Sequence, residues 1–578
     1  MNLRLTWVQP EDLVGHELRQ AAEDGREAAA IAARWHAAGG PPAPETAGAS
    51  AAPRPDLRPL AEELLDALAS LATPTSEHEP TPLPGIQALT PPTSPPPNSD
   101  ETDPPTPKPR REAPGPGSHE AEAPDQARSE ATGARRLGGE APDHTPREAP
   151  GPRGTGGRAP HHPPETRGSG GGAPGPVRVS GRGGVGGGNL PREAPGGRGF
   201  GGSAPGPVRV SGRGGVGEIN APLGESRALR NRLHAAWLGR AAGCLLGKPV
   251  EKLPLAAIRA LARAAGNWPL STWFTARGVP PELLAAHPWN RRSATTSLAE
   301  NIDGMPEDDD LNYPLLNLLL LQRYGRDFTT ADVARLWLDE LPAGRTFTAE
   351  RVAYRNLLDG VEPPLTAVHR NPFREWIGAQ IRADVHGWTH PGDPVAAASQ
   401  AYRDAALTHT ANGVYGAMFV AATLATAATG TADVHRSLAA GLGVIPPRSR
   451  LAAAVRLGIA AAREESDFDT VVDRLHAELG GYHWVHAVPN AALLAAALTH
   501  GDGDFSRSVC AAVSGGWDTD SNGATAGSVA GLLAGHPDRL PEQWTTPLKN
   551  RLATSVPSFD GIGFDTLAEL THLEAVRP

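Results

Sequence analysis

One stretch near the C-terminus, Ser514 to Gly535, restricts the fold more than any other part of the chain. It reads SGGWDTDSNGATAGSVAGLLAG, and glycines recur in it at four-residue steps, at Gly523, Gly527, Gly531 and Gly535. This spacing places three of them on one face of a helix and leaves the last as a C-terminal stop. Because glycine is a poor helix former, a helix that keeps such a stripe is expected to press against another backbone.

The same stretch begins with a turn that carries three oxygen-bearing side chains. Gly515 and Gly516 can adopt backbone angles closed to other residues, so the chain can turn sharply there. The residues that follow include Asp518, Asp520 and Ser521. We therefore expect these three side chains to aim at one point.

A second acidic group lies about two hundred residues upstream. Asp308, Asp309 and Asp310 precede a leucine-rich run that begins at Leu311 and reads as the core face of a helix, with Pro314 in its first turn. One interpretation is an N-terminal cap, worth about 0.3–1 kcal/mol. A cap needs only one carboxylate, however, and three adjacent ones repel each other. We favour a cation site, and oxygen ligands of this number suit Mg²⁺, Mn²⁺ or Ca²⁺, as a pair about 3.5–4 Å apart.

The first half of the chain divides into two regions. Residues 1–72 predict a small helical module with helices near 10–25, 26–39 and 56–72, either a docking module for a protein partner or an accessory segment packed on the main domain.

Residues 73–225 have no hydrophobic periodicity, and APGPVRVSGRGGVG occurs there at 173–186 and again at 204–217. About half of the 67 glycines and 59 prolines lie in this region, which predicts a disordered linker because so little apolar surface can be buried. Its Arg-Gly runs hold one stacking ring, so a tether is favoured over an RNA-binding segment.

The remaining residues, 226–578, predict one compact all-α domain of ten or more helices. Alternating Val-Ile runs are absent, and the main spans with helical spacing are 396–407, 411–428, 449–463, 469–479, 489–499 and 523–534. Seven tryptophans of this domain are expected to fill the core and line a groove: Trp237, Trp268, Trp273, Trp289, Trp337, Trp376 and Trp388.

Cysteine content, charge and hydropathy restrict the cellular compartment and the kinds of partner that the chain is expected to have. The two cysteines, Cys244 and Cys510, cannot build a disulfide framework, which predicts a reducing cytoplasmic environment with both residues in the core. The N-terminus lacks a signal-peptide pattern, and no apolar run reaches the roughly 20 residues that a membrane span requires. A net charge of −10 argues against nucleic-acid binding by the whole chain.

The motifs also resemble those of a known family. The domain from about Arg230 to Glu574 resembles the ADP-ribosylglycohydrolases, of the dinitrogenase reductase-activating glycohydrolase type, which are all-helical enzymes with a two-metal centre that remove ADP-ribose from modified targets. The first motif, GRAAGCLLGKPVE at 239–251, implies that Glu251 is the catalytic or metal-proximal glutamate. Cys244 stands where the family usually has aspartate.

Two further motifs carry the resemblance and imply a ligand set. PEDDDLNY resembles the family's Thr-Asp-Asp-Thr; the ligand pair is Asp309 and Asp310 in the frame we prefer, with Asp308 and Leu311 at the hydroxyl positions, or Asp308 and Asp309 one residue earlier. GGWDTDS resembles Gly-Gly-Asp-Thr-Asp-Thr with Trp517 inserted. The implied metal-binding residues are Asp308, Asp309, Asp310, Asp518, Asp520 and Ser521.

Weaker matches imply residues that bind the substrate. Gly378 to Arg382 resembles the family loop beside the diphosphate, and Thr408-His409 a step near the nucleotide, although Arg382 could instead pair with a carboxylate and His409 could be a helix histidine. The implied substrate-binding residues are Gly378, Arg382, His409, Gly515 and Gly516. The resemblance thus implies a hydrolase that uses two divalent cations, Mg²⁺ or Mn²⁺, to release ADP-ribose from protein or nucleic acid. The alternatives are a non-catalytic ADP-ribose-binding adaptor and a hydrolase of another N-glycoside.

Overall fold

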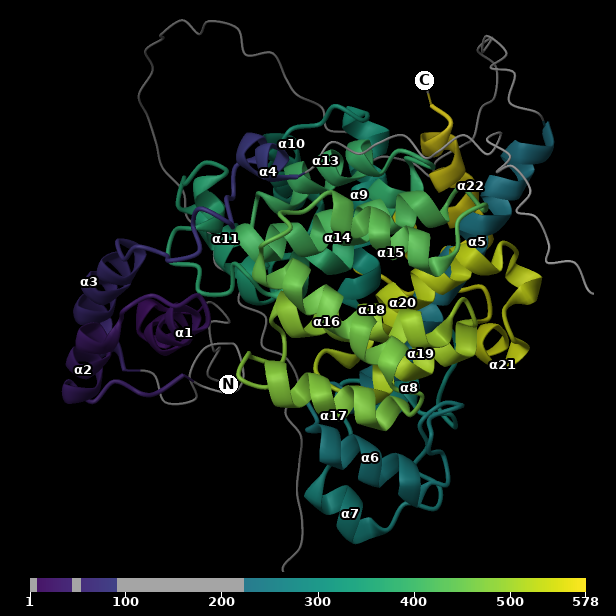
Figure 1. Ribbon diagram of the computed structural model, residues 1–578, viewed down its shortest axis with the longest axis horizontal. Coiled ribbons are helices and arrows are strands. Elements are labelled where there is room, and N and C mark those ends of the chain that lie inside the picture. The colour runs from purple at the N-terminus through teal and green to yellow at the C-terminus, as the bar shows by residue number, and fades with distance from the viewer. Residues whose placement is uncertain (1–7, 44–53, 91–222, 578) are drawn as a thin grey trace, which may run out of the picture. The chain divides into compact units, whose positions relative to one another are not determined.

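Helices account for all the regular secondary structure that a computed structural model of the chain describes (Figure 1). The structure describes residues 8–43, 54–90 and 223–577, and these hold twenty-two α-helices, eight short 3-10 helices and no β-strand. The β-type pairing among the described residues is limited to three isolated bridges. This confirms the predicted all-α class. The predicted linker lies outside the described residues from 91 to 222.

Four helices form the N-terminal segment, which we define as residues 8–90. They are α1 (Pro10–Glu23), α2 (Ala29–Ala37), α3 (Arg58–Ala69) and α4 (Leu83–Leu89). The first three match the predicted helices. The fourth lies in the range assigned to the linker, so that assignment is wrong for residues 83–89. Pro84 and Gly85 weaken the helical signal of this stretch, but Ile86 is fully buried and stabilises the helix by packing.

The rest of the described chain forms the larger helical body, and all described residues belong to one compact unit. α14 and α18 are buried on nearly all sides, which places them at its centre. The helices are α5 (Leu223–Gly247), α6 (Leu255–Ala264), α7 (Pro281–Ala286), α8 (Ala294–Ser297), α9 (Asp309–Tyr324), α10 (Thr330–Glu340), α11 (Thr348–Leu358), α12 (Asp384–Trp388), α13 (Pro394–Ala405), α14 (Ala411–Ala427), α15 (Val434–Gly443), α16 (Arg450–Glu464), α17 (Phe468–Leu479), α18 (Ala487–Gly501), α19 (Phe505–Ser514), α20 (Thr519–Ala534), α21 (Glu542–Thr545) and α22 (Phe564–Ala575).

The glycine stripe of α20 packs against a second glycine stripe, on α5. A methyl group added at Gly243 would lie 1.9 Å from the Gly523 carbonyl oxygen, and one added at Gly527 would lie 2.0 Å from the Gly239 carbonyl oxygen. The two backbones therefore touch, as the stripe predicts. Gly535 ends α20 with a left-handed φ of 79°.

The acidic triplet lies at the start of α9, but Pro314 is not in the first turn. Asp308 is the N-cap residue, and its side chain accepts a hydrogen bond from the Asp310 backbone N–H at 2.9 Å. Pro314 lies in the second turn, where it cannot donate to the carbonyl of Asp310. That carbonyl accepts instead from Nε of Arg240 at 2.8 Å, which compensates for the missing helical hydrogen bond.

Five of the seven tryptophans expected in the core are buried there. Trp237 and Trp388 pack edge to face with ring centroids 4.7 Å apart, and Trp268 and Trp289 are only half-buried. None of the seven lines the cavity described next, whose lining includes Trp484 instead.

Candidate functional site

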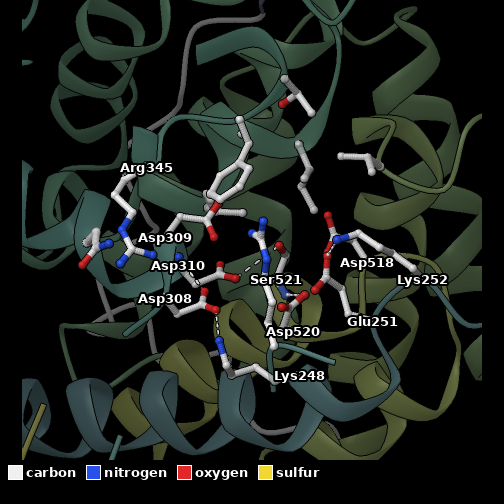
Figure 2. A pocket seen from close by; sticks show the side chains of 18 of the residues that line it. Lys248, Glu251, Lys252, Asp308, Asp309, Asp310, Arg345, Asp518, Asp520 and Ser521 are labelled. Atoms are coloured by element: carbon white, nitrogen blue, oxygen red, sulfur yellow. Dashed lines mark hydrogen bonds and ion pairs between the residues drawn. The ribbon is translucent and has the colours of Figure 1, made fainter. Parts of the chain in front are cut away.

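Carboxylates from three distant parts of the sequence line one cavity of about 490 Å³. Figure 2 shows the aspartates of the α9 N-terminus and those of the α20 N-terminus pointing toward each other across it, with Glu251 beside the latter. The acidic side chains and hydroxyl in its lining that the sequence singled out are Glu251, Asp308, Asp309, Asp310, Asp518, Asp520 and Ser521. The two acidic groups of the sequence thus meet, and their role as ligands stays a prediction.

The contact between α5 and α20 positions one side of the cavity. The Thr519 hydroxyl donates to the Gly247 carbonyl at 2.9 Å, so the first turn of α20 is tied to the end of α5, four residues before Glu251. The backbone N–H of Asp518 donates to Oδ1 of Asn490 at 3.1 Å. These bonds fix the acidic turn to α5 and α18.

The opposite side is joined to the first by a direct contact. The Ser521 hydroxyl donates to Oδ2 of Asp310 at 3.3 Å. The fully buried Arg240 guanidinium ion-pairs with Asp310 at 3.3 Å and with Asp384 at 2.8 Å. Residues that are 211 positions apart in sequence are therefore held in hydrogen-bonding distance.

Two lysines also reach the acidic cluster. Lys248 ion-pairs with Asp308. Lys252 ion-pairs with Oε1 of Glu251 at 2.7 Å, and Asn290 Nδ2 donates to Oε2 of the same carboxylate at 2.7 Å. Burial opposes the ionisation of Asp308, but the Lys248 ammonium outweighs it and lowers the pKa of Asp308. Neither lysine was singled out from the sequence, although both flank Glu251.

Among the other four aspartates of the cluster, Asp310 pairs with Arg240, which does not offset its burial, and Asp309, Asp518 and Asp520 form no ion pair with a described cationic side chain. Burial and then the neighbouring carboxylates raise the pKa of Asp309, Asp310 and Asp518 well above its usual value. Burial, followed by the Glu251 and Asp308 charges, raises the pKa of Asp520 to about 7. A cluster of this kind needs added positive charge to be fully ionised, and its oxygen donors suit divalent Mg²⁺ or Mn²⁺. The residues present therefore fit the expected cations.

Cys244 is a core residue that lies beside the cluster. It is fully buried, as predicted, but its sulfur and one oxygen each of Asp308 and Asp310 lie within 4.8 Å of one another. Leu311, at one of the two hydroxyl positions of the family's second motif, is buried in the core and does not line the cavity. Trp517 has a positive φ of 53° and stacks on His476 with ring centroids 4.0 Å apart, which leaves the adjacent Asp518 in the lining.

Of the five residues expected to bind substrate, Gly378 alone lies in the lining. Arg382 is fully buried beneath it, because its guanidinium is held by Glu350 at 2.8 Å and by Asp404 at 2.6 Å. His409 is also fully buried, and burial, followed by the Arg382 charge, lowers its pKa well below the usual value. Neither residue lines the cavity, so the expected direct contact is not seen, but both lie within 4.0 Å of the Glu350 carboxylate, which does line it.

The two glycines of the acidic turn are likewise outside the lining. Gly516 has a φ of 79°, which glycine alone adopts readily, and it turns the chain toward Asp518. Gly515 precedes it and packs against Leu493. Both glycines shape the turn, and neither contributes to the lining of the cavity.

Most of the apolar and cationic residues of the lining were not expected from the sequence. These side chains have no shared motif and come from several segments, so sequence spacing carries no signal for them. The principal ones are Val8, Arg292, Arg345, Phe347, Arg351, Phe373, Ile377, Ile381, Trp484 and Val485. Within the described part of the chain, no helix has both the length and the apolar character needed to cross a lipid bilayer.

Comparison with known proteins gives one family. Its model, described as ADP-ribosylglycohydrolase, matches residues 225–575, which is more than half of the chain and includes Glu251 and both groups of aspartates. No curated protein matches. Among solved structures, a chain described as an "ADP-ribosylglycohydrolase-related protein complex" is 20% identical with a TM-score of 0.38, and the match covers 60% of this chain and 98% of that one. On the extent of the family match, this chain belongs to the ADP-ribosylglycohydrolase family.

Proposed function

We propose that this protein hydrolyses the glycosidic bond between an ADP-ribosyl group and a protein or nucleic-acid target, and that it needs two divalent cations, Mg²⁺ or Mn²⁺. The observation that supports this most is the single cavity lined by Glu251 and by the aspartates at 308–310, 518 and 520. Membership of the family supports a glycohydrolase. The acidic cluster supports the cation requirement, because the protein itself supplies too little positive charge to balance it.

The cations would be held by the predicted set, Asp308, Asp309, Asp310, Asp518, Asp520 and Ser521. When bound, divalent cations supply Lewis-acid chemistry at sugar oxygens and at water. The protein contributes fixed donors: the Asn490 amide holds the backbone of Asp518, and Arg240 holds Asp310. Such preorganised oxygens bind a cation without first reorganising.

Glu251 is the residue we assign to proton transfer. Its two oxygens are fixed by Lys252 and Asn290 at 2.7 Å each, so the carboxylate keeps one orientation toward the cavity. In the proposed reaction the C1″ bond to the target breaks, and the oxygen of a water molecule bonds to C1″. Glu251 takes a proton from that water and passes it on to the leaving nitrogen or oxygen of the target, which regenerates the carboxylate, so atoms and charge balance.

The cationic part of the lining supports a diphosphate-containing substrate. Arg292 and Arg345 lie in the lining together with the acidic cluster, and Arg345 is half-exposed while it pairs with Glu307 at 2.7 Å. Guanidinium groups bind diphosphate oxygens by paired hydrogen bonds. An ADP-ribosyl group carries both parts that this lining complements, a ribose and a diphosphate.

Product analysis tests the proposal. Full-length protein with Mn²⁺ is incubated with ADP-ribosyl-arginine, ADP-ribosyl-serine and ADP-ribosylated DNA, and free ADP-ribose is measured by chromatography. We expect release from at least one substrate and none after chelation. Absence of release from all three, or release of a different product, would refute the proposal.

The Glu251→Gln variant tests the assignment of proton transfer. We expect cation binding to persist in calorimetry while turnover falls by at least about a hundredfold, the scale of general acid–base catalysis. Glutamine keeps the size of the side chain, so the fold of η2 (Lys248–Val250) before it is unchanged. Turnover at the wild-type rate would remove Glu251 from the mechanism.

One observation favours a second candidate, a non-catalytic reader of ADP-ribose. Lys248 already pairs with Asp308, so one carboxylate of the predicted ligand set is balanced by the protein itself. A reader would bind ADP-ribose tightly and release nothing from any of the three substrates. Calorimetry with ADP-ribose beside the product analysis separates the two functions.

The setting we propose is the cytoplasm. Cys244 and Cys510 are both buried and free, and neither has a cysteine partner among the described residues. Buried free thiols fit a reducing compartment.

A further inference from the structure

The N-terminal segment contributes a residue to the cavity. Val8 lines it and is only 3% exposed. The carbonyl of Val8 accepts a hydrogen bond from Arg355 Nη1 at 3.2 Å. Arg355 lies on α11 one turn after Arg351, which is itself part of the lining. The first described residue of the chain is therefore held at the site by the larger helical body.

The cavity that Val8 lines also has an apolar wall made of two paired segments, which we define as residues 373–377 and 483–487. Trp376 and His486 form an antiparallel bridge, and the backbone N–H of Ile377 donates to the Val485 carbonyl at 2.9 Å. The wall presents to the cavity the side chains of Phe373, Ile377, Trp484 and Val485.

The helix α1 packs against this wall. The ring of His16 lies edge-on to that of Phe373, with centroids 4.9 Å apart, and edge-on to that of Trp376 at 6.1 Å. Burial, and then the nearby His483 and Arg19 charges, lowers the pKa of His16 to about 3, so the ring is neutral. Neither of its nitrogens has a hydrogen-bond partner among the described residues. His16 thus serves as a flat packing group behind the wall.

Buried ion pairs fix the N-terminal segment in this position. Arg374, within the wall, pairs with Glu17 at 2.9 Å and with Asp24 at 3.4 Å. Arg450 pairs with Glu79 and with Glu375, at 2.8 Å each. Removing one partner of a buried pair leaves an uncompensated charge, which is strongly unfavourable. Several buried ion pairs therefore join the wall to the N-terminal segment.

We infer that the N-terminal segment is part of the substrate site: Val8 contacts the adenine of the bound ADP-ribosyl group, and α1 positions the apolar wall that receives it. This rests on the proposed function. Of the parts of an ADP-ribosyl group, the riboses are polyhydroxylated and the diphosphate is charged, so adenine alone complements a surface of valine, isoleucine and aromatic side chains.

The Val8→Trp variant of the full-length protein tests this. The indole fills space that adenine would occupy, so the Kd of ADP-ribose should rise by at least about tenfold in calorimetry, while that of ribose 5-phosphate, which has no base, stays within about twofold. KM should rise with kcat nearly unchanged, because the chemistry lies at the carboxylates. Mn²⁺ affinity should not change. ADP-ribose affinity equal to wild type in the folded variant would overturn the inference.

A matched control and a second variant distinguish a specific effect at Val8 from misfolding. Ala33 lies exposed on α2 of the same segment, so Ala33→Trp should bind both ligands as wild type does. If Val8→Trp fails to fold, Val8→Ala should weaken ADP-ribose by about threefold to tenfold through lost contact area, and unchanged affinity there overturns the inference equally. Wild-type protein that binds ADP-ribose without hydrolysing it would refute the proposed hydrolysis and keep this inference; wild type that binds no ADP-ribose would overturn both.

The positioning role of α1 has its own test in His16. His16→Ala should raise the Kd of ADP-ribose by about fivefold or more and leave ribose 5-phosphate unaffected, because the wall loses its backing. His16→Phe should restore wild-type affinity, since only the flat ring is used. Failure of phenylalanine to restore binding in a folded variant would contradict the packing role.

Discussion

The carboxylates of the cavity differ in how far the protein balances each of them. Asp308 has Lys248 and Asp310 has Arg240, whereas no cationic side chain forms an ion pair with Asp309, Asp518 or Asp520 among the described residues. The protein therefore balances the charges of Asp308 and Asp310 but not those of the other three aspartates. The unbalanced aspartates are the ones for which added cations bring the largest gain.

Removing an unbalanced ligand should abolish the reaction. Asp309→Ala and Asp518→Ala are each expected to lower Mn²⁺ affinity by at least about tenfold in calorimetry and to reduce ADP-ribose release to background, because each removes a donor that no other side chain replaces. Asp359→Ala, at an exposed position outside the cavity, is the control. Full activity of both cavity variants after chelation would refute the cation site.

Lys248 should compete with the cations it lies beside. Lys248→Met removes its ammonium but keeps the length of the side chain, and we expect Mn²⁺ to bind at least about tenfold more tightly. Without cations the variant should melt below wild type, because Asp308 then lies buried and unpaired. Added Mn²⁺ should close that gap in a thermal shift assay. Weaker Mn²⁺ binding than wild type would show that Lys248 helps to form the site.

Residue types alone did not reveal which predicted substrate residues face the cavity. Arg382 matches a family loop, and its sequence surroundings contain no sign that Glu350 and Asp404 enclose it. Both acids are distant in sequence, and their positions depend on how α11 and α13 pack. The acidic motifs could be placed because carboxylate repulsion and glycine turns are local properties of the sequence.

At the level of helices, the site depends on the contact between α5 and α20. Glu251 follows α5 after one 3-10 turn, and Asp518 directly precedes the first residue of α20, so the separation of the two helices sets the distance between these carboxylates. A spacer of one methyl group between the backbones would push them apart. The glycines at this contact are thus part of how the site is built.

Substitution of a contact glycine should affect both stability and activity. Gly243→Ala places a methyl group 1.9 Å from the Gly523 carbonyl oxygen, which backbone movement alone can relieve. We expect the free energy of unfolding in urea to fall by about 1–3 kcal/mol and hydrolysis to decrease. Gly224→Ala, on the same helix with no atom within 4 Å, is the matched control and should cause no loss. Equal stability of the two variants would contradict the close contact.

The positions of most helices could be predicted from the sequence. The sequence also contained a signal for the partner of α20, which was not used. The expected helix at 411–428 is α14 (Ala411–Ala427), and that at 449–463 is α16 (Arg450–Glu464). Gly239, Gly243 and Gly247 repeat at the same four-residue step as the α20 glycines, and this match was the available signal. α4 could not be predicted, since its burial depends on tertiary contacts.

At the level of the whole molecule, the sequence left the role of the N-terminal segment open. Its attachment uses pairs such as Glu17 with Arg374, which are 357 residues apart. In the sequence, neither Glu17 nor Arg374 differs from an ordinary surface charge. Long-range charge pairing has no periodicity, so it became visible only in the folded structure, whose contacts are those of a segment packed on the main domain.

One carboxylate of this attachment is poorly compensated. Glu23 lies at the end of α1, where Oε1 accepts from the His483 backbone N–H at 3.0 Å and Oε2 has no hydrogen-bond partner among the described residues. Burial raises its pKa to about 7, and the Glu375 carboxylate adds to this, whereas the His483 N–H and the Arg19 and Arg450 charges oppose it. His486 Nε2 lies 3.9 Å away, but burial and then Arg450 lower the pKa of His486 well below its usual value.

Attachment of the N-terminal segment should therefore weaken as pH rises. A carboxyl whose pKa is raised on folding contributes fully below its unfolded pKa and loses that contribution as pH rises through about 7. Glu23→Gln cannot ionise, so its free energy of unfolding relative to wild type should increase by about 1–3 kcal/mol between pH 5 and pH 8. Urea unfolding at several pH values measures this, with the exposed Glu77→Gln of the same segment as the control. A difference between Glu23→Gln and wild type that stays constant with pH would show that Glu23 ionises freely where it lies.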